Sequence, residues 1–289
     1  MKVAYVIDSS AGLSHELANH PDVYTVTLKI NLPDGQTFDD TTDNDTMKLF
    51  YNSLADRKIL PSTSQPEPSD YVEIVEDIKK KDYDTIIGIF ISSGISGTMQ
   101  TAHQALTNLA SDLDVRIIDS KGTSYLMEDM LIQAMKMVEA GLDIDTIGEK
   151  LKWVVDKSVI YVAIEDYETL KKGGRVNSFE SFFGSNLNIY PILYFNDEGK
   201  ITTFEKIRGQ KRLLRRFKQI VEEALAEYPG KIKIAFAHGD AWDELKPFSD
   251  ELQAEHPEIT IRHGYLTPVL GSHGGKGAKG MGILVQATF

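Results

Sequence analysis

Short apolar runs alternate with segments of helical periodicity along the first half of the chain. Runs with the character of buried strands are predicted at 3–7, 24–30, 85–91 and 115–118. Helices are predicted at 45–57, 68–81, from 97 onward and at 124–140, the first of them with Asp45 as its N-cap. Repeated strand–helix units with buried apolar strands indicate a parallel sheet that is flanked by helices.

The second half has a different order of predicted elements, because its strands come in pairs. After a helix at 143–155 and a strand at 159–163, the strands 188–195 and 200–204 flank the turn Asn196–Gly199, where glycine permits a positive φ. Further elements are predicted at 211–228 (helix), 231–237 (strand), 241–255 (helix), 259–263 (strand) and 282–287 (strand). The fold class is therefore α/β with two domains: an N-terminal parallel-sheet domain over residues 1–155 and a C-terminal mixed-sheet domain over residues 156–289.

Composition and charge argue against several classes of function. The 289 residues carry a formal net charge of -12, which argues against general nucleic-acid binding, although the segment 206–218 is locally basic. The chain has no cysteine, which excludes disulfides and thiolate chemistry and fits a reducing cytoplasm. The N-terminus has the pattern of a first strand, and no apolar run approaches the roughly 18 residues that span a bilayer, so we expect no stable membrane insertion.

Two runs rich in hydroxyls suggest a seat for a small anion. Thr63-Ser64-Gln65-Pro66 and Ser92–Thr98 are both predicted at the beginnings of helices, where free backbone N–H groups hold a carboxylate or phosphate without a lysine. Asp8-Ser9-Ser10 and Asp119-Ser120 each follow a predicted strand and could face the same crevice, because ligands bind beyond the carboxyl ends of parallel strands. N-capping is the competing interpretation of both pairs.

Other chemistries fit the residues less well. The segment Gly94-Ile95-Ser96-Gly97 misses the glycine spacing of a nucleophile elbow by one position, and only His238 and His273 lie in glycine-rich settings that could supply a base. The glycines at 275–280 match a dinucleotide fingerprint by letter, but only nine residues follow them, too few for a βαβ unit. The acidic residues at 39–45 lack the pattern of a calcium loop, so we expect no metal and no cofactor. A hydrolase or phosphotransferase in the serine-rich crevice, and a binder of a small phosphate ligand, remain as alternatives.

Five segments together resemble the DegV family of bacterial fatty-acid-binding proteins. They are Asp8-Ser9-Ser10, 63–68, 92–102, 115–120 and Leu170-Lys171-Lys172-Gly173-Gly174-Arg175-Val176, and they span nearly the whole chain. The chain departs from the family at its closing loop, Gly271–Gly277, which keeps His273 but lacks the usual threonine and proline.

The resemblance implies a long-chain fatty acid such as palmitate held between two domains, in a protein that is a carrier and not itself an enzyme. By the family pattern Thr63 and Ser93 hydrogen-bond the carboxylate, with Ser64, Gly94, Ser96, Asp8, Ser9 and His273 near the ligand. Candidates for the walls of the acyl tunnel are Phe182, Phe183, Ile189 and Leu193. Some family members present the acid to an ATP-dependent fatty-acid kinase, and Arg208 and Arg212 are the candidates for contact with that partner or with the phosphate.

Overall fold

The computed structural model describes residues 1–55, 60–165, 167–176 and 189–289. The first part of the chain forms β1 (Val3–Asp8), η1 (Ser9–Ala11), α1 (His15–Ala18), β2 (Val23–Val26), β3 (Lys29–Asn31), β4 (Thr37–Asp39), α2 (Asn44–Ala55), β5 (Ser62–Ser64), η2 (Pro68–Tyr71), α3 (Val72–Lys80), β6 (Thr85–Phe90), α4 (Thr98–Leu109), β7 (Asp114–Asp119), α5 (Tyr125–Glu139) and α6 (Ile144–Lys157). The second part forms β8 (Val159–Ala163), α7 (Tyr167–Gly173), β9 (Ile189–Phe195), β10 (Ile201–Arg208), α8 (Gln210–Glu227), β11 (Ile232–His238), α9 (Trp242–Glu255), β12 (Thr260–Tyr265), α10 (Pro268–Gly274) and β13 (Lys279–Val285).

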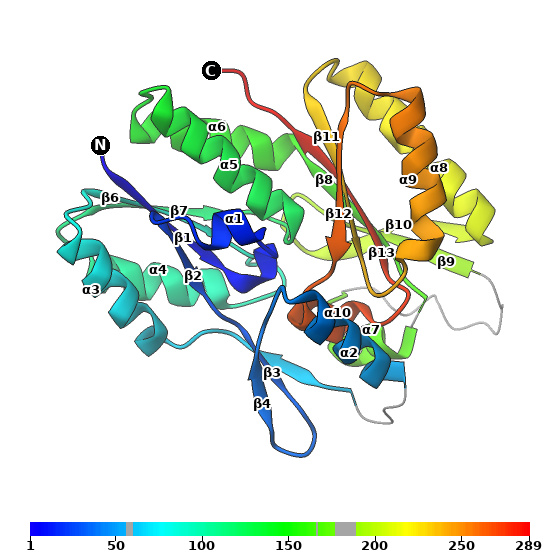
Figure 1. Cartoon of the computed structure of the whole chain (residues 1–289), viewed down its shortest axis with the longest axis horizontal. Helices are drawn as coiled ribbons and strands as arrows, with labels where there is room; N and C mark the ends of the chain where they lie inside the picture. The colour runs from blue at the N-terminus through cyan, green and yellow to red at the C-terminus, as the bar shows by residue number, and fades with distance from the viewer. Residues whose placement is uncertain (56–59, 166, 177–188) are drawn as a thin grey trace.

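The predicted fold class is confirmed by two main sheets (Figure 1). The first has the order β2-β1-β6-β7, and all of its pairings are parallel. The second has the order β10-β9-β8-β13-β11-β12 and is mixed, since only β11 and β12 run parallel. The carboxyl ends of the first sheet's strands therefore form one edge, at which a ligand site is expected.

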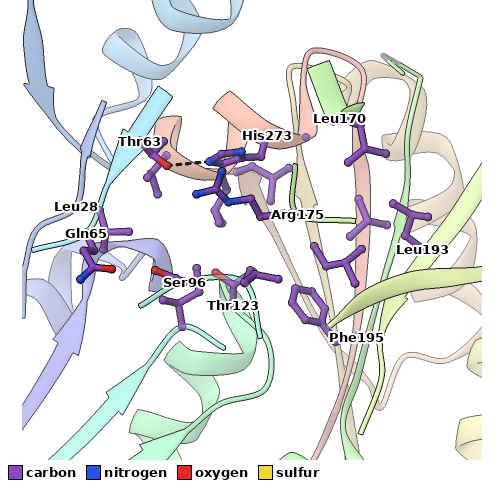
Figure 2. Close-up of a pocket in the computed structure, with 18 of the residues that line it drawn as sticks. Leu28, Thr63, Gln65, Ser96, Thr123, Leu170, Arg175, Leu193, Phe195 and His273 are labelled. Carbon is purple, nitrogen blue, oxygen red and sulfur yellow. Dashed lines mark hydrogen bonds between the residues drawn. The ribbon is translucent and has the colours of Figure 1, made fainter. Parts of the chain in front are cut away.

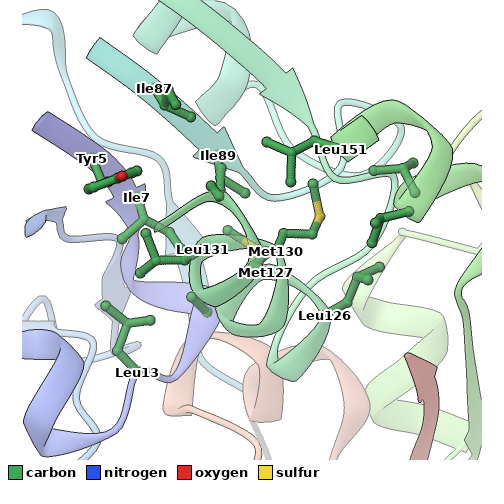
Figure 3. Packing of buried hydrophobic residues seen from close by; sticks show 14 of the residues in the cluster. Tyr5, Ile7, Leu13, Ile87, Ile89, Leu126, Met127, Met130, Leu131 and Leu151 are labelled. Carbon is green, nitrogen blue, oxygen red and sulfur yellow. The ribbon is translucent and has the colours of Figure 1, made fainter. Parts of the chain in front are cut away.

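Helices cover the faces of the two main sheets, so the fold consists of alternating layers. Alternate residues of β1 enter different cores: Tyr5 and Ile7 pack with α5 and α6, whereas Val6 packs with α3 and α4. Figure 3 shows Met127, Met130 and Leu131 of α5 against this face of the first sheet. The same core includes residues of β11 and β13, so the α5–α6 layer is shared by both sheets, and α8 and α9 cover the outer face of the second sheet. Sharing one helical layer joins the two domains through a continuous apolar core.

A third, small antiparallel sheet, β4-β3-β5, was not predicted. Its presence corrects two expectations. The run at 24–30 divides into β2 and β3, which belong to different sheets, and Thr63 lies on β5 and not at the start of a helix. The N-cap of α2 was also assigned wrongly, since the Asp43 carboxylate, and not that of Asp45, accepts the backbone N–H of Thr46 at 2.8 Å.

Candidate ligand-binding site

A cavity of about 530 Å³ lies where the first sheet, the small sheet and the second sheet meet. Its apolar lining comes from both halves of the chain: Leu28, Ile91, Ile95, Val162, Ile164, Leu170, Leu193, Phe195, Ile201, Leu266, Val269 and Leu270. Its polar lining consists of Thr63, Ser64, Gln65, Ser96, Thr123, Tyr194, Arg175 and His273. Among the described residues that line it there is no aspartate or glutamate, so the site offers hydrogen-bond donors and one permanent positive charge to a ligand.

Thr63 and His273 meet at one end of the cavity, although 210 positions separate them in the sequence (Figure 2). The Thr63 hydroxyl is 2.8 Å from Nε2 of His273, which contradicts the expectation that His273 lies in a loop, because it belongs to α10. Burial, and then the charge of Arg175, lower the pKa of His273 to about 4. The imidazole is therefore neutral at physiological pH, with one nitrogen that donates and one that accepts.

Arg175 is the charged residue of the lining. It follows Gly173 and Gly174 at the end of α7, and its Nη1 donates to the carbonyl of Gly173 at 2.7 Å. A Cβ atom on Gly173 would lie 2.9 Å from Nδ1 of His273, so α7 and α10 approach closely only because this residue is glycine. The sequence signal that could have identified Arg175 is this pair of glycines directly before a cation.

The two serines of the 92–98 run that were candidates for the site have different surroundings. Ser96 lines the cavity just before α4, and its hydroxyl lies 2.8 Å from that of Thr98. Ser93 is exposed and is not among the lining residues, and its hydroxyl donates to the carboxylate of Asp119. Gln65, which the sequence did not single out as a site residue, lines the cavity and donates to the Thr101 hydroxyl at 2.7 Å.

The remaining candidates support the site from outside or lie elsewhere. Asp8 is fully buried and accepts the backbone N–H groups of Ser10 and Ile91, which ties the end of β1 to the end of β6. The Ser9 hydroxyl accepts the N–H of Leu28 at 3.0 Å. Ser64 lines the cavity, whereas Gly94 does not, because its Cα faces the carbonyl of Gly199.

Of the four residues expected in the tunnel wall, Leu193 lines the cavity, Ile189 lies on β9 and is not among the lining residues, and Phe182 and Phe183 fall outside the described residues. Arg208 ends β10 and Arg212 lies in the first turn of α8; both are exposed and neither lines the cavity. None of the helices in the described ranges combines the length and the apolar character of a membrane span.

The family model described as "Uncharacterised protein, DegV family" matches residues 2–286. The chain belongs to the DegV family. It is 32% identical over 280 residues to a DegV domain-containing protein of Listeria monocytogenes, with 97% of each chain covered.

Solved structures of DegV proteins show the same fold. A protein described as a fatty acid binding DegV family protein from Streptococcus agalactiae superposes with a TM-score of 0.89, at 32% identity, covering 99% of this chain and 100% of that one. DegV from Bacillus subtilis, described as a fatty acid binding protein, gives a TM-score of 0.87 at 29% identity, again with 99% and 100% coverage.

Proposed function

We propose that this protein binds a long-chain fatty acid, such as palmitate, in the cavity between its two main sheets and acts as a carrier. The observation that carries the proposal is the mixed lining of the cavity, which offers hydroxyls, His273 and Arg175 to a polar head group and a larger number of apolar side chains to a tail. A fatty acid has both parts, and each CH₂ group that it buries contributes about 0.8 kcal/mol. The two solved DegV proteins described as fatty-acid-binding support the choice of ligand.

We propose that the carboxylate accepts hydrogen bonds from Thr63 and Ser96 and pairs with Arg175. A carboxylate that leaves water needs such donors, and hydrogen bonds to a charged group are the strong ones. The Thr63 hydroxyl lies 2.8 Å from Nε2 of His273, so Thr63 can turn its O–H toward the ligand only in the tautomer in which Nε2 carries the proton and donates to the threonine oxygen. Ser93, which the family pattern names, donates to Asp119 and is not among the lining residues, whereas Ser96 lines the cavity, so Ser96 is the better-placed serine.

Denaturing extraction and mass spectrometry of the purified protein test this function, because a carrier retains fatty acid from its host. After delipidation, Ser96→Ala is expected to lower affinity for palmitate about 10-fold or more, the effect of removing one hydrogen bond to a charged group. Ser93→Ala is the matched control and should change affinity less than about threefold. If Ser93→Ala weakens binding and Ser96→Ala does not, the family assignment of the serine holds and ours fails.

Arg175→Met tests the ion pair separately. The variant keeps the aliphatic bulk but removes the charge, so it should weaken binding of the acid about 10-fold and leave binding of the methyl ester unchanged. Equal loss for acid and ester would show that Arg175 acts through packing alone.

Hydrolysis is less well supported than binding. Ser93 donates to Asp119, Ser96 pairs with Thr98, and no histidine in the described part of the chain contacts either serine. A small phosphate ligand would leave most of the apolar lining unused. Retention of fatty acid by the purified protein distinguishes binding of lipid from both alternatives.

We further propose that the protein acts in the cytoplasm and presents the bound acid to an ATP-dependent kinase, with Arg208 and Arg212 at the contact. Both are exposed on the segment that joins β10 to α8, away from the cavity lining. Reversing both charges should lower acyl-phosphate formation while palmitate affinity stays unchanged. Charge reversal at Lys152, which is 77% exposed on α6, is the control. Unchanged kinase turnover in the double variant would refute the assignment.

A further inference from the structure

A second cavity of about 560 Å³ borders the first, and two residues of β9, Tyr194 and Phe195, line both. Its apolar lining includes Leu126, Val155, Val159 and Ile160. Its polar residues include the ion pair of Lys121 and Asp156, whose nitrogen and oxygen are 3.4 Å apart, together with Asn196 and Asp197 of the β9–β10 turn. None of the three residues proposed to bind the carboxylate, Thr63, Ser96 and Arg175, lines this second cavity.

The two cavities follow one another along the same strands. In β8, Val162 lines the first cavity and Ile160 the second, and residues two apart in a strand point to the same face. Val162 pairs with Leu193 and Tyr161 with Tyr194, so the next position in register sets Ile160 opposite Phe195. The aliphatic side chains of β8 therefore continue from the first cavity into the second. Phe195, which lines both cavities, lies at the boundary between them.

The loop before α5 and the first turn of α5 border the two cavities in the same order. Thr123 lines the first cavity and Leu126 the second. Gly122 precedes Thr123, and a Cβ atom there would come within 2.8 Å of Leu126 and 3.0 Å of Ile160, so glycine at this position allows the loop to pack closely against both side chains.

Phe195 lies away from Thr63 and His273 across the cavity in Figure 2. An acyl chain with its carboxylate at that end would approach Phe195 with its terminal carbons. We propose that the second cavity is an extension chamber for acyl chains longer than the first cavity holds, with Phe195 as the gate between them. This inference rests on the proposed fatty-acid binding, and it makes Phe195 and Ile160 determinants of chain length.

Binding of a series of saturated acids to the delipidated full-length protein tests the proposal. Myristic, palmitic, stearic, arachidic and behenic acids would be titrated by competition with a fluorescent fatty acid. For the wild-type protein, affinity for behenic acid should lie within about threefold of that for stearic acid, because the extra carbons have a chamber to occupy. Ile160→Trp fills the chamber, and it should weaken arachidic and behenic acid about 10-fold while myristic and palmitic acid stay within about twofold.

Phe195→Ala removes the gate and should raise the ratio of behenic to palmitic affinity by about fivefold. Phe38→Ala is the control, because Phe38 is an exposed aromatic residue of β4 that lines neither cavity; its ratio should not change. The chamber is refuted if the ratio of behenic to palmitic affinity is unchanged in both Ile160→Trp and Phe195→Ala. It is also refuted if Ile160→Trp lowers the affinity for every acid equally. If the wild-type protein binds none of the acids, the proposed function itself has failed.

Discussion

Gly199→Ala tests the contact between the β9–β10 turn of the C-terminal domain and the loop that carries Ser92 and Ser96. Gly199 lies in the β9–β10 turn with φ +70°, and its carbonyl accepts a 2.6 Å hydrogen bond from the hydroxyl of Ser92, which is fully buried. A Cβ atom on Gly199 would lie 2.1 Å from that hydroxyl oxygen and 3.3 Å from Cα of Lys121. No side chain fits there unless the turn moves away from Ser92.

The expected cost has two parts. A left-handed backbone costs an alanine about 1–2 kcal/mol relative to glycine. Moving the turn also breaks the Ser92 bond and leaves a buried hydroxyl without that partner, at about 1–3 kcal/mol. Gly199→Ala should therefore lower the free energy of unfolding by about 2–5 kcal/mol.

Gly35→Ala is the matched control. Gly35 has φ +88°, but no atom outside its own chain neighbours lies within 4 Å of its added Cβ, so only the backbone cost of about 1–2 kcal/mol remains. Chemical denaturation followed by circular dichroism measures both variants against wild type. Gly199→Ala should also weaken palmitate binding, because the backbone N–H of Ser96 bonds to the carbonyl of Ser92 in the same turn. If the two variants are equally stable, the Ser92–Gly199 contact does not hold the domains together.

Two further predictions concern buried carboxylates. Burial raises the pKa of Asp40 from 3.8 to about 7, so the folded protein keeps a proton that the unfolded chain releases. The stability of wild type relative to Asp40→Asn should therefore fall as pH rises from about 4 to about 7, in denaturant melts at each pH. The histidines are common to both proteins and cancel, and a difference that does not vary with pH would refute the shift. Glu128 of α5 is fully buried and bonds to Arg262 of β12 at 2.6 Å, so Arg262→Met should destabilise by about 3 kcal/mol, whereas Lys246→Met, at an exposed pair, should cost less than about 0.5 kcal/mol. Equal melting temperatures for these two variants would contradict the role of Glu128 as a charge that needs its partner.

The regular part of the fold could be predicted because each of its elements carries its own signal. The central strands of the first sheet, β1 and β6, are continuous buried runs, and the turn Asn196–Gly199 was predicted from its residue types. The small sheet carries no such signal. Its strands have three residues each, and β4 is exposed throughout, so neither length nor periodicity distinguishes them from loops.

The candidate site was predicted only in part, because its walls come from segments that are distant in the sequence. Composition drew attention to Thr63 and to the serine run, but which hydroxyl faces the cavity depends on the turn between β6 and α4. That turn directs Ser96 to the cavity and Ser93 to Asp119, three positions apart in the chain. Arg175 was quoted in the family motif but was not assigned to the site, since the sequence of α7 alone does not show that α10 packs against it.

Affinity and stability should be coupled in this protein, because the cavity is formed by contacts between the domains. Leu28 and Thr63 come from the first part of the chain, Leu193 and His273 from the second, and the unfolded chain has no such cavity to offer a ligand. A ligand that binds only the folded state adds RT ln(1 + [L]/Kd) to the free energy of unfolding, about 2.7 kcal/mol at a hundredfold excess over Kd. Substitutions that move the Gly199 turn act on both quantities, whereas Ser96→Ala removes a proposed ligand contact and leaves the Ser92–Gly199 bond in place. Unfolding with and without palmitate therefore separates residues that build the cavity from residues that hold the acid.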